Sequence, residues 1–362
     1  MCGIAGIFAY MSDAAPVDSE ELLRIRERMH SRGPDGEGLW IADDQRVGLA
    51  HRRLAIIDLS DAGAQPMHDP ETGNCIVFNG EIYNYQALRA ELITAGHRFR
   101  SHSDTEVLLR LYALHGAQML HRLRGMFAFA IWDQAKQGML IARDPFGIKP
   151  LYLADDGRTL RLASQVKALL AGGAVDTAPE PAGHVGFFVW GSVPEPYTLY
   201  RGIRALPAGH SLWIERGGTK QQQAFVELKQ IFAVADNDEA RIGPAEARQA
   251  LHDALLDSVR HHLVADVPVG VFLSAGLDST TIAALASESG VQDLRTLTLG
   301  FKEFTGTDND EVPLAETVAA QLGARHHTRW VERDDFADQY QGLLDAMDQP
   351  SIDGVNSYFV AK

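Results

Sequence analysis

The chain has 362 residues, enough for two domains that each have a hydrophobic core. Its 33 Lys and Arg residues against 48 Asp and Glu residues give a net charge of −15 without a basic run, which argues against nucleic acid or an anionic membrane surface as a partner. No signal-peptide pattern or membrane-length apolar run is present and the two cysteines suit a reducing compartment, so we expect a cytoplasmic protein with no membrane partner.

The first strand-like run, residues 1–8, carries a cysteine directly behind the initiator methionine. If Met1 is removed, Cys2 bears both a thiol and a free α-amine. An α-amine has an ordinary pKa of about 7.7–8.0 and can act as a base for the thiol near neutral pH. The alternative is that Cys2 is a small buried residue at the start of a strand. Cys75, inside an apolar run, is expected to be a core residue.

Helical and strand patterns alternate after this run. Residues 18–30 place apolar groups at helical spacing behind an acidic first turn, and the Gly-Pro break within 31–36 ends this helix. Strand patterns follow at 38–41, 47–58, 76–78, 125–133 and 138–144, and helical patterns at 85–95 and from 103 onward. Because strands outnumber helices and the helices lie between groups of strands, we expect sheets packed between helical layers.

Adjacent polar residues behind one strand can assist a cysteine nucleophile. A cysteine that attacks an amide needs hydrogen-bond donors for the oxyanion and a site that excludes water. Asn79 and Gly80 offer one side-chain N–H and one backbone N–H, and glycine lets the backbone approach the ligand closely. The alternative is that this Asn-Gly pair forms a tight turn.

Three charged residues are candidates for holding the substrate. Arg53 can bind a carboxylate through two parallel hydrogen bonds, and Glu81 or Asp104 can bind an ammonium group. Asp104 and Ser103 also suit the N-cap of a helix, which is the alternative role. A substrate that carries both charges at one end is an α-amino acid, so these residues favour an amino-acid amide as the substrate.

Six motifs together resemble those of class II glutamine amidotransferases. In order they are Met1-Cys2-Gly3-Ile4, Arg32-Gly33-Pro34-Asp35, His51-Arg52-Arg53-Leu54, Asn79-Gly80-Glu81-Ile82-Tyr83-Asn84, Ser103-Asp104-Thr105-Glu106 and Arg143-Asp144-Pro145-Phe146-Gly147. Each motif alone is common, but the ordered set resembles the glutaminase half of a glutamine-hydrolysing asparagine synthetase. The resemblance implies an α+β N-terminal nucleophile fold, an αββα sandwich. It further implies that Cys2 is the nucleophile, that Asn79 and Gly80 form the oxyanion hole, and that Arg53, Asn79, Glu81 and Asp104 bind glutamine.

A polar stretch separates the two halves of the chain. Residues 183–213 resemble the segments that close the first domain in this family, and residues 215–241 carry a glutamine run and an acidic run typical of a linker. We therefore predict a glutaminase domain over residues 1–213, a linker over 214–243 and the first part of a synthetase domain over 244–362.

The second half opens with a nucleotide-type turn. A strand pattern at 267–273 and a helical pattern from 280 enclose the small-residue turn 274–279, which would expose backbone N–H groups at a helix N-terminus. The turn is no Walker A loop, because no Gly-Lys-Ser/Thr ends it. It resembles the pyrophosphate loop of ATP pyrophosphatases, which cleave ATP to AMP and pyrophosphate, although an ordinary βα turn is the alternative.

Strands and helices then alternate over 294–301, 311–322, 326–331 and 336–347, which predicts an α/β doubly wound parallel sheet with ligands at the strand carboxyl ends. The resemblance implies a set of ATP-binding residues: Leu273, Ser274, Gly276, Asp278, Ser279 and Leu299. Ala275 stands where the family usually has glycine. If that position needs a positive φ, its Cβ costs about 1–2 kcal/mol and crowds a phosphate, and otherwise it is harmless. We predict that nucleotide turnover is reduced but not abolished.

The family resemblance also bears on completeness. About three parallel strands precede residue 362, few for a covered parallel sheet, and the Ser-Gly-x-Gly-x-Asp-Glu segment of the family does not appear. We expect the second fold to be incomplete at residue 362. The chain is then either a fragment of a longer polypeptide or a shortened protein with an impaired second site.

The resemblance implies a ligase that makes asparagine from aspartate, ATP and glutamine, releasing glutamate, AMP and pyrophosphate. ATP and Mg²⁺ are the implied cofactors; Asp278 suits Mg²⁺ by type, but no metal ligand is assigned. A homodimer is left open. One alternative is an amidotransferase of the same architecture that acts on another carboxylate or on a glycan or peptide precursor. The other is a glutaminase or glutamine-binding module without synthetase activity.

Overall fold

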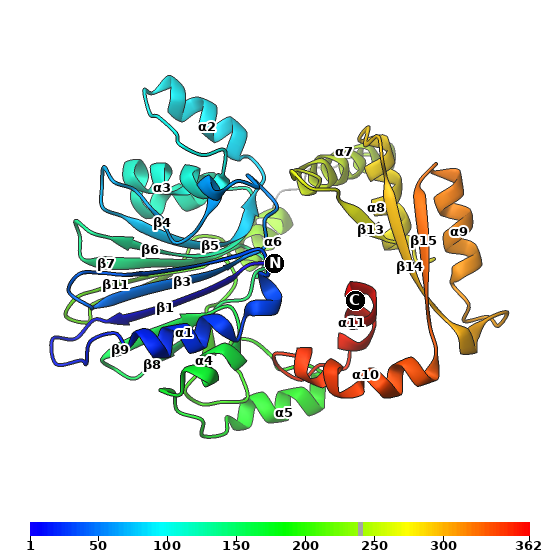
Figure 1. The fold of residues 1–362 in the computed structure, drawn as a ribbon. Helices are drawn as coiled ribbons and strands as arrows, with labels where there is room; N and C mark the ends of the chain where they lie inside the picture. The colour runs from blue at the N-terminus through cyan, green and yellow to red at the C-terminus, as the bar shows by residue number, and fades with distance from the viewer. Residues whose placement is uncertain (238–241) are drawn as a thin grey trace. The chain divides into compact units, whose positions relative to one another are not determined.

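The computed structural model describes residues 1–237 and 242–362, and the chain divides into two units, Met1–Asp238 and Glu239–Lys362 (Figure 1). The first unit contains two six-stranded antiparallel sheets. In spatial order one sheet contains β10 (Arg204–Ala205), β8 (Tyr152–Asp155), β9 (Thr159–Ala163), β1 (Gly3–Ala9), β3 (Val47–Arg53) and β2 (Gly36–Ile41). The other contains β12 (Lys220–Ala224), β11 (His210–Glu215), β7 (Gly138–Arg143), β6 (Gly125–Asp133), β5 (Cys75–Ile82) and β4 (Met67–His68).

Helices cover the outer faces of both sheets. Helices α1 (Ser19–Glu27) and α4 (Val166–Gly172) pack on the first sheet. Helix α3 (Asp104–His115) lies over the second, and α2 (Tyr85–Thr94) packs against α3 (Figure 1). The unit also contains α5 (Pro181–Trp190) and α6 (Leu228–Asn237). The four layers form the αββα sandwich expected from the sequence, which confirms the predicted fold class of this half.

Strand β1 shows why the first residues of the chain are uniformly apolar. Alternate residues of a strand point to opposite faces. Ile4 and Phe8 join the core between the two sheets, where the Phe8 and Trp132 rings meet edge to face at 5.3 Å. Ala5 and Ile7 join the core beneath α1 and α4. The strand is buried on both faces, and it holds the segment before it at one rim of the sandwich.

The second unit is built on a three-stranded parallel sheet with the order β13 (Gly270–Phe272), β14 (Arg295–Phe301) and β15 (Arg325–Val331). Its helices are α7 (Pro244–His262), α8 (Leu277–Glu288), α9 (Val312–Gln321), α10 (Arg333–Ala346) and α11 (Gly354–Ala361). The predicted alternation of strands and helices around a parallel sheet is confirmed. None of the helices in the described residues is long and apolar enough to span a membrane.

The structure differs from the sequence prediction in two places. The predicted linker of residues 214–243 contains strand β12, which pairs with β11, and helix α6. The glutamine run, which looked like linker sequence, forms this exposed edge strand. Residues 238–241 of this linker lie outside the described residues, and the domain boundaries remain a prediction. The strand predicted over 47–58 ends at Arg53, and Asp58 adopts a φ of 53°, so the chain turns away from the sheet there.

Candidate active site

Cys2 lies immediately before β1 at the rim of the sandwich. Arg32, at the end of the short helix η1 (His30–Arg32), fixes the backbone there by donating from Nε to the Cys2 carbonyl oxygen at 2.9 Å. The Cys2 Sγ accepts a hydrogen bond from the Leu54 N–H at 3.3 Å. Burial raises the pKa of the Cys2 thiol, so attack through the thiolate requires a nearby base.

The α-amine at the start of the chain is a group suited to that task. In this structure Met1 carries the amine, and burial lowers its pKa below the ordinary value, which favours the neutral base. After removal of Met1, the backbone nitrogen of Cys2 becomes the amine of the same residue as the thiol.

Asn79 and Gly80 lie inside β5 rather than in a tight turn, paired with Ala128 and Phe127 of β6. The Asn79 side chain is 1% exposed, and neither its amide oxygen nor its amide nitrogen has a hydrogen-bond partner among the described residues. A buried amide without a protein partner costs free energy, and a bound ligand could supply the missing hydrogen bonds. A Cβ at Gly80 would overlap the Met126 carbonyl oxygen and lie 2.8 Å from Phe127 Cα, so only glycine fits.

The backbone of Phe78, the residue before Asn79, is fixed at both its N–H and its carbonyl oxygen. The Gln65 Oε1 accepts from the Phe78 N–H at 2.6 Å, and the His51 Nε2 lies 3.1 Å from the Phe78 carbonyl oxygen. Burial lowers the pKa of His51 to about 3, so its imidazole is neutral at neutral pH and donates from Nε2. Gln65 was not identified from the sequence; no motif marks it, because its role arises from a contact with a distant strand.

Arg53 ends β3 and holds the following loop. Its guanidinium donates to the Ser60 carbonyl oxygen at 2.8 Å and to the Asp58 carbonyl oxygen. The Asp58 carboxylate in turn accepts from the His102 N–H at 2.7 Å. Arg53 is thus partly occupied by backbone acceptors, and the loop it binds forms one side of the site.

Glu81 and Lys149 form a buried pair at the same rim. The Lys149 Nζ lies 3.6 Å from the Glu81 Oε2, and the two side chains are 2% and 10% exposed. The Asp144 carboxylate positions this lysine by accepting from its backbone N–H at 3.0 Å. Sequence reasoning missed Lys149; the signal available was a lysine beside the Arg143–Gly147 motif in an otherwise apolar segment.

Asp104 is the first residue of α3, and Ser103 is the N-cap that accepts from the Thr105 N–H at 3.1 Å. The Asp104 carboxylate accepts from the Ile82 N–H at 2.9 Å. Burial raises the pKa of Asp104 to about 7, and the nearby Glu81 charge adds to this shift. The carboxylate therefore gains from a cation placed beside it.

The residues predicted from the sequence as catalytic or glutamine-binding line one small cavity of about 30 Å³: Cys2, Arg53, Asn79, Gly80, Glu81 and Asp104. This volume is close to that of one water molecule, so an amino acid can enter only if side chains or the loop bound by Arg53 move. The structure places the thiol, the unpartnered amide and the charged residues around one space, which is the arrangement needed for attack on a side-chain amide.

The predicted nucleotide residues fall into two groups in the second unit. Leu273, Ser274 and Leu299 line a cavity of about 280 Å³. Gly276 is the N-cap of α8, and Asp278 and Ser279 lie in its first turn. The Ser279 Oγ donates to the Ser274 carbonyl oxygen at 2.8 Å, which links the helix start to the cavity rim.

Ala275 does not adopt a positive φ. The non-glycine residues with positive φ in the described part of the chain are Gln45, Asp58 and Gln137. Ala275 is not among them, so its Cβ carries no positive-φ cost, and its effect on nucleotide turnover stays a prediction. No group of three or more His, Cys, Asp or Glu side chains within residues 1–237 and 242–362 is placed to hold a metal ion. A nucleotide-borne Mg²⁺ needs only one or two protein carboxylates, and Asp278 fits that requirement.

Comparison with known families agrees with this geometry. Residues 1–226 match the model of the glutamine amidotransferase domain, and residues 250–362 match that of asparagine synthase. Among solved structures, glutamine phosphoribosylpyrophosphate amidotransferase of Bacillus subtilis aligns over 90% of this chain and 65% of its own, with a TM-score of 0.48 and 17% identity. The family match over residues 1–226 shows that the first unit contains a glutamine amidotransferase domain.

Curated relatives cover both units. Glutamine-hydrolysing asparagine synthetase 1 of Bacillus subtilis is 35% identical over 100% of this chain and 55% of its own length. Asparagine synthetase B of Escherichia coli is 35% identical over 90% of this chain and 53% of its own length. A putative glutamine-hydrolysing asparagine synthetase of Methanocaldococcus jannaschii is 31% identical over 95% of this chain and 68% of its own length. The chain belongs to the family of glutamine-hydrolysing asparagine synthetases. It spans slightly more than half the length of the Bacillus and Escherichia proteins.

Proposed function

We propose that the first unit hydrolyses glutamine at Cys2. The observation that carries this proposal is the buried Asn79 amide, which has no partner in the described residues and lines the same cavity as the Cys2 thiol. Arg53 would bind the α-carboxylate of glutamine, and Glu81 and Asp104 its α-ammonium group.

The reaction follows from these positions. The α-amine of processed Cys2 takes the thiol proton, and Sγ forms a bond to the side-chain carbonyl carbon of glutamine. The Asn79 amide and the Gly80 N–H donate to the oxyanion of the tetrahedral intermediate. The carbon–nitrogen bond then breaks, and the nitrogen leaves as ammonia with the proton from the amine. Water attacks the thioester, which releases glutamate and restores the thiol.

Membership of the family supports the further proposal that the protein is a glutamine-dependent asparagine synthetase. Leu273 and Leu299 would contact adenine, while Ser274, Gly276, Asp278 and Ser279 would surround the pyrophosphate. ATP would activate the aspartate carboxylate as an adenylate, and ammonia would displace AMP to give asparagine. Mg²⁺ bound with ATP would neutralise phosphate charge beside Asp278. A cytoplasmic location and a homodimer belong to this proposal.

The glutaminase proposal is tested with the purified full chain. Glutamate release from glutamine is expected for the wild type and for Cys75→Ala, which changes a buried core cysteine, and is expected to be lost in Cys2→Ala. Intact-mass measurement of the active protein should show that Met1 is absent. Activity in a chain that retains Met1, or in Cys2→Ala, would refute the assignment.

The acceptor is tested separately. AMP formation is followed with ATP, Mg²⁺, glutamine and either aspartate or another carboxylate, glycan or peptide precursor. Aspartate-dependent AMP formation with asparagine as the product supports the synthetase proposal. AMP formation that requires another acceptor would favour the broader amidotransferase, and glutamate release without AMP formation from any acceptor would favour a glutaminase module.

A further inference from the structure

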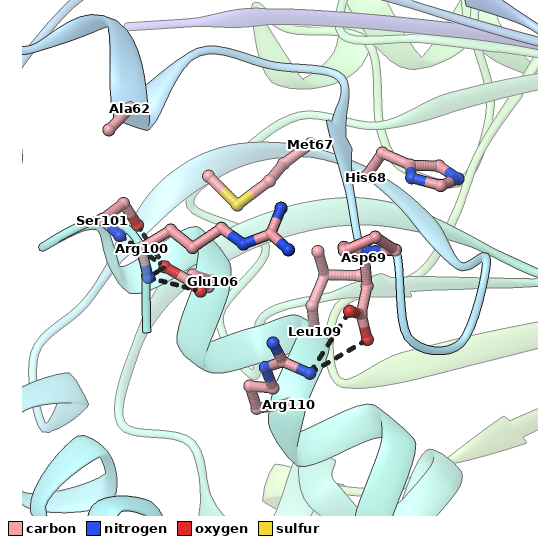
Figure 2. Close-up of a pocket in the computed structure, with 10 residues that line it drawn as sticks. Ala62, Met67, His68, Asp69, Arg100, Ser101, Glu106, Leu109 and Arg110 are labelled. Atoms are coloured by element: carbon pink, nitrogen blue, oxygen red, sulfur yellow. Dashed lines mark hydrogen bonds and ion pairs between the residues drawn. The ribbon is translucent and has the colours of Figure 1, made fainter. Parts of the chain in front are cut away.

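A second cavity lies beside the proposed glutaminase site, between residues 62–70 and α3, and no step of the proposed reaction uses it (Figure 2). Its volume is about 220 Å³. Because a water molecule occupies about 30 Å³ in the liquid, the cavity has room for a small organic molecule. Met67 and Leu109 give part of its wall an apolar surface.

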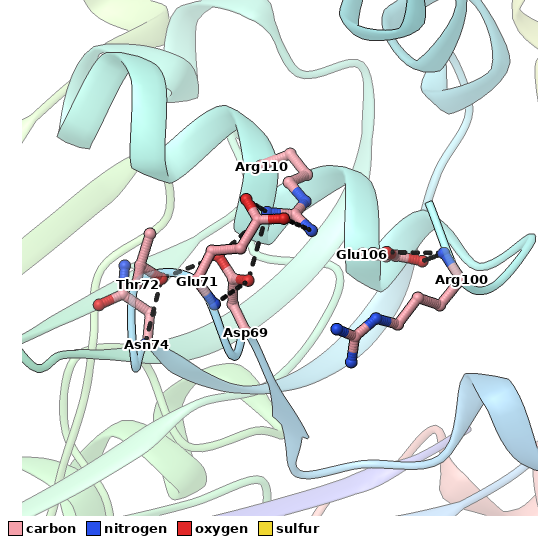
Figure 3. Close-up of polar contacts among 7 residues, drawn as sticks. All are labelled: Asp69, Glu71, Thr72, Asn74, Arg100, Glu106 and Arg110. Atoms are coloured by element: carbon pink, nitrogen blue, oxygen red, sulfur yellow. Dashed lines mark hydrogen bonds and ion pairs between the residues drawn. The ribbon is translucent and has the colours of Figure 1, made fainter. Parts of the chain in front are cut away.

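The acidic residues of this cavity already have partners (Figure 3). Glu106 accepts hydrogen bonds from the Arg100 N–H at 3.0 Å and from the Ser101 N–H at 2.8 Å. Asp69 pairs with the Arg110 guanidinium at 3.2 Å, and both of these side chains are buried. Neither carboxylate is left to bind a cationic ligand.

Arg100 is the exception among the charged residues of the cavity. Its side chain extends from the loop before α3 across the cavity toward Met67 (Figure 2). Within the described residues, the guanidinium makes no hydrogen bond or ion pair, whereas its backbone N–H is fixed by Glu106. An unpaired guanidinium presents two parallel N–H donors, which match a carboxylate. The cavity thus combines one available cation with an apolar wall.

The cavity and the proposed glutaminase site share their dividing wall. On α3, Asp104 lines the site whereas Glu106 and Leu109 line the cavity. On the segment that faces α3, Gln65 lines the site whereas Met67 lines the cavity. A displacement of either wall would reach the residues of both spaces.

A chain of hydrogen bonds also joins the Arg100 loop to Arg53. The His102 N–H, two residues after Arg100, donates to the Asp58 Oδ2 at 2.7 Å. The Asp58 carbonyl oxygen accepts from the Arg53 guanidinium. The loop that carries Arg100 therefore contacts the same residue that orients the expected glutamine-binding arginine.

From these contacts we propose that the cavity binds a small monocarboxylate, with its charged group on Arg100 and its hydrocarbon part against Met67 and Leu109, and that its occupancy changes the affinity of the neighbouring site for glutamine. The second half of this inference rests on the proposed glutaminase function. Coupling between two sites is reciprocal, so glutamine must change the affinity for the carboxylate by the same factor.

The binding half is tested by calorimetric titration of the full chain with acetate, butyrate, hexanoate and inorganic phosphate. Butyrate is expected to bind more tightly than acetate, by up to about fourfold for each added methylene group. Arg100→Gln is expected to weaken butyrate binding at least tenfold. Arg98→Gln removes the same charge from an exposed arginine outside the cavity and is the matched control, expected to leave binding unchanged.

Three outcomes would overturn the binding half: no carboxylate binds the wild type, butyrate binds Arg100→Gln as tightly as the wild type, or phosphate binds through Arg100 more tightly than every carboxylate. The last result would identify an oxyanion site instead. Ala62 is exposed at the cavity, so Ala62→Trp, which adds bulk without removing a contact of Arg100, is a second variant expected to lose butyrate binding.

The coupling half is tested in Cys2→Ala, which is expected to bind glutamine without turnover. Saturating butyrate is expected to change the Kd for glutamine at least twofold, and Arg100→Gln is expected to abolish this change. In the chain with Cys2 intact, Arg100→Gln should keep the glutaminase rate measured without butyrate. Equal Kd values with and without butyrate would overturn the coupling. If glutamine does not bind at all, the proposed function and the coupling both fail, whereas Arg100-dependent butyrate binding would still establish the cavity as a site.

Discussion

At the scale of single residues, Asn79 is expected to contribute to catalysis but little to the stability of the fold. Its amide lacks a partner in the described residues, so Asn79→Ala removes no hydrogen bond from the folded protein. We expect kcat for glutamate release to fall by about 10²–10³, as for loss of one oxyanion donor, with little loss of stability.

Asn74→Ala is the matched control for this prediction, because the buried Asn74 Oδ1 accepts from the Gln134 N–H at 3.1 Å. This control should destabilise the fold by about 1–3 kcal/mol with a small effect on kcat. The two quantities are measured by glutamate release and urea unfolding. A variant Asn79→Ala with wild-type kcat would exclude its role as a donor.

The raised pKa of Asp104 predicts that glutamine binding depends on pH. Its pKa is raised to about 7, so it is largely protonated below neutral pH and offers a carboxylate to the substrate ammonium group only above it. The Kd for glutamine, measured with Cys2→Ala, should therefore decrease by up to about tenfold per unit as pH rises toward 7 and then level off. The Asp104→Asn variant should bind weakly without this dependence. A wild-type Kd constant from pH 5 to 8 would contradict the prediction.

The raised pKa of Asp104 has the opposite effect on the stability of the fold, which decreases as pH rises. The folded state holds the Asp104 proton at pH values where the unfolded state, with an ordinary aspartate pKa of about 3.9, has lost it. The contribution of Asp104 to the free energy of unfolding therefore decreases as pH rises from about 4 to 7. Acid conditions thus favour the fold at this residue and disfavour the substrate.

At the scale of elements, β5 determines the oxyanion geometry through its close approach to β6. Gly80→Ala would drive a Cβ against the Met126 carbonyl oxygen and to within 2.8 Å of Phe127 Cα. We expect the strands to separate locally, with glutaminase activity lost and a stability loss of about 1–3 kcal/mol or more.

Gly36→Ala in β2 is the strand-glycine control, because its Cβ would meet the Arg53 Cβ at an ordinary 3.5 Å. Thermal unfolding and glutamate release measure both effects. If Gly80→Ala behaves like Gly36→Ala, the close approach is not what fixes the site.

The sequence predicted most of the elements, and its ordered motifs named Cys2, Asn79 and Gly80, which the structure brings to one cavity. Their catalytic roles stay predictions. It could not predict contacts between distant segments. Gln65 acts on Phe78, and Lys149 acts on Glu81, through pairings that only the folded sheets create. The polar composition around residues 220–224 also indicated a linker, whereas these residues form the exposed edge strand β12.

At the scale of the whole molecule, the proposed glutaminase site depends on one unit. The residues that line it lie between Cys2 and Thr105, and the buried pair adds Lys149, all within Met1–Asp238. We therefore expect the full chain to release glutamate from glutamine without ATP or aspartate, with a kcat that changes less than threefold when both are added.

The control for this prediction is Asp278→Ala. This variant alters the first turn of α8 in the other unit and should leave glutamate release unchanged while weakening ATP binding. Glutamate release that appears only with ATP and aspartate would show that the second unit completes the site. Cys2 and Asn79 would then supply the nucleophile and the amide donor but would not be sufficient for hydrolysis.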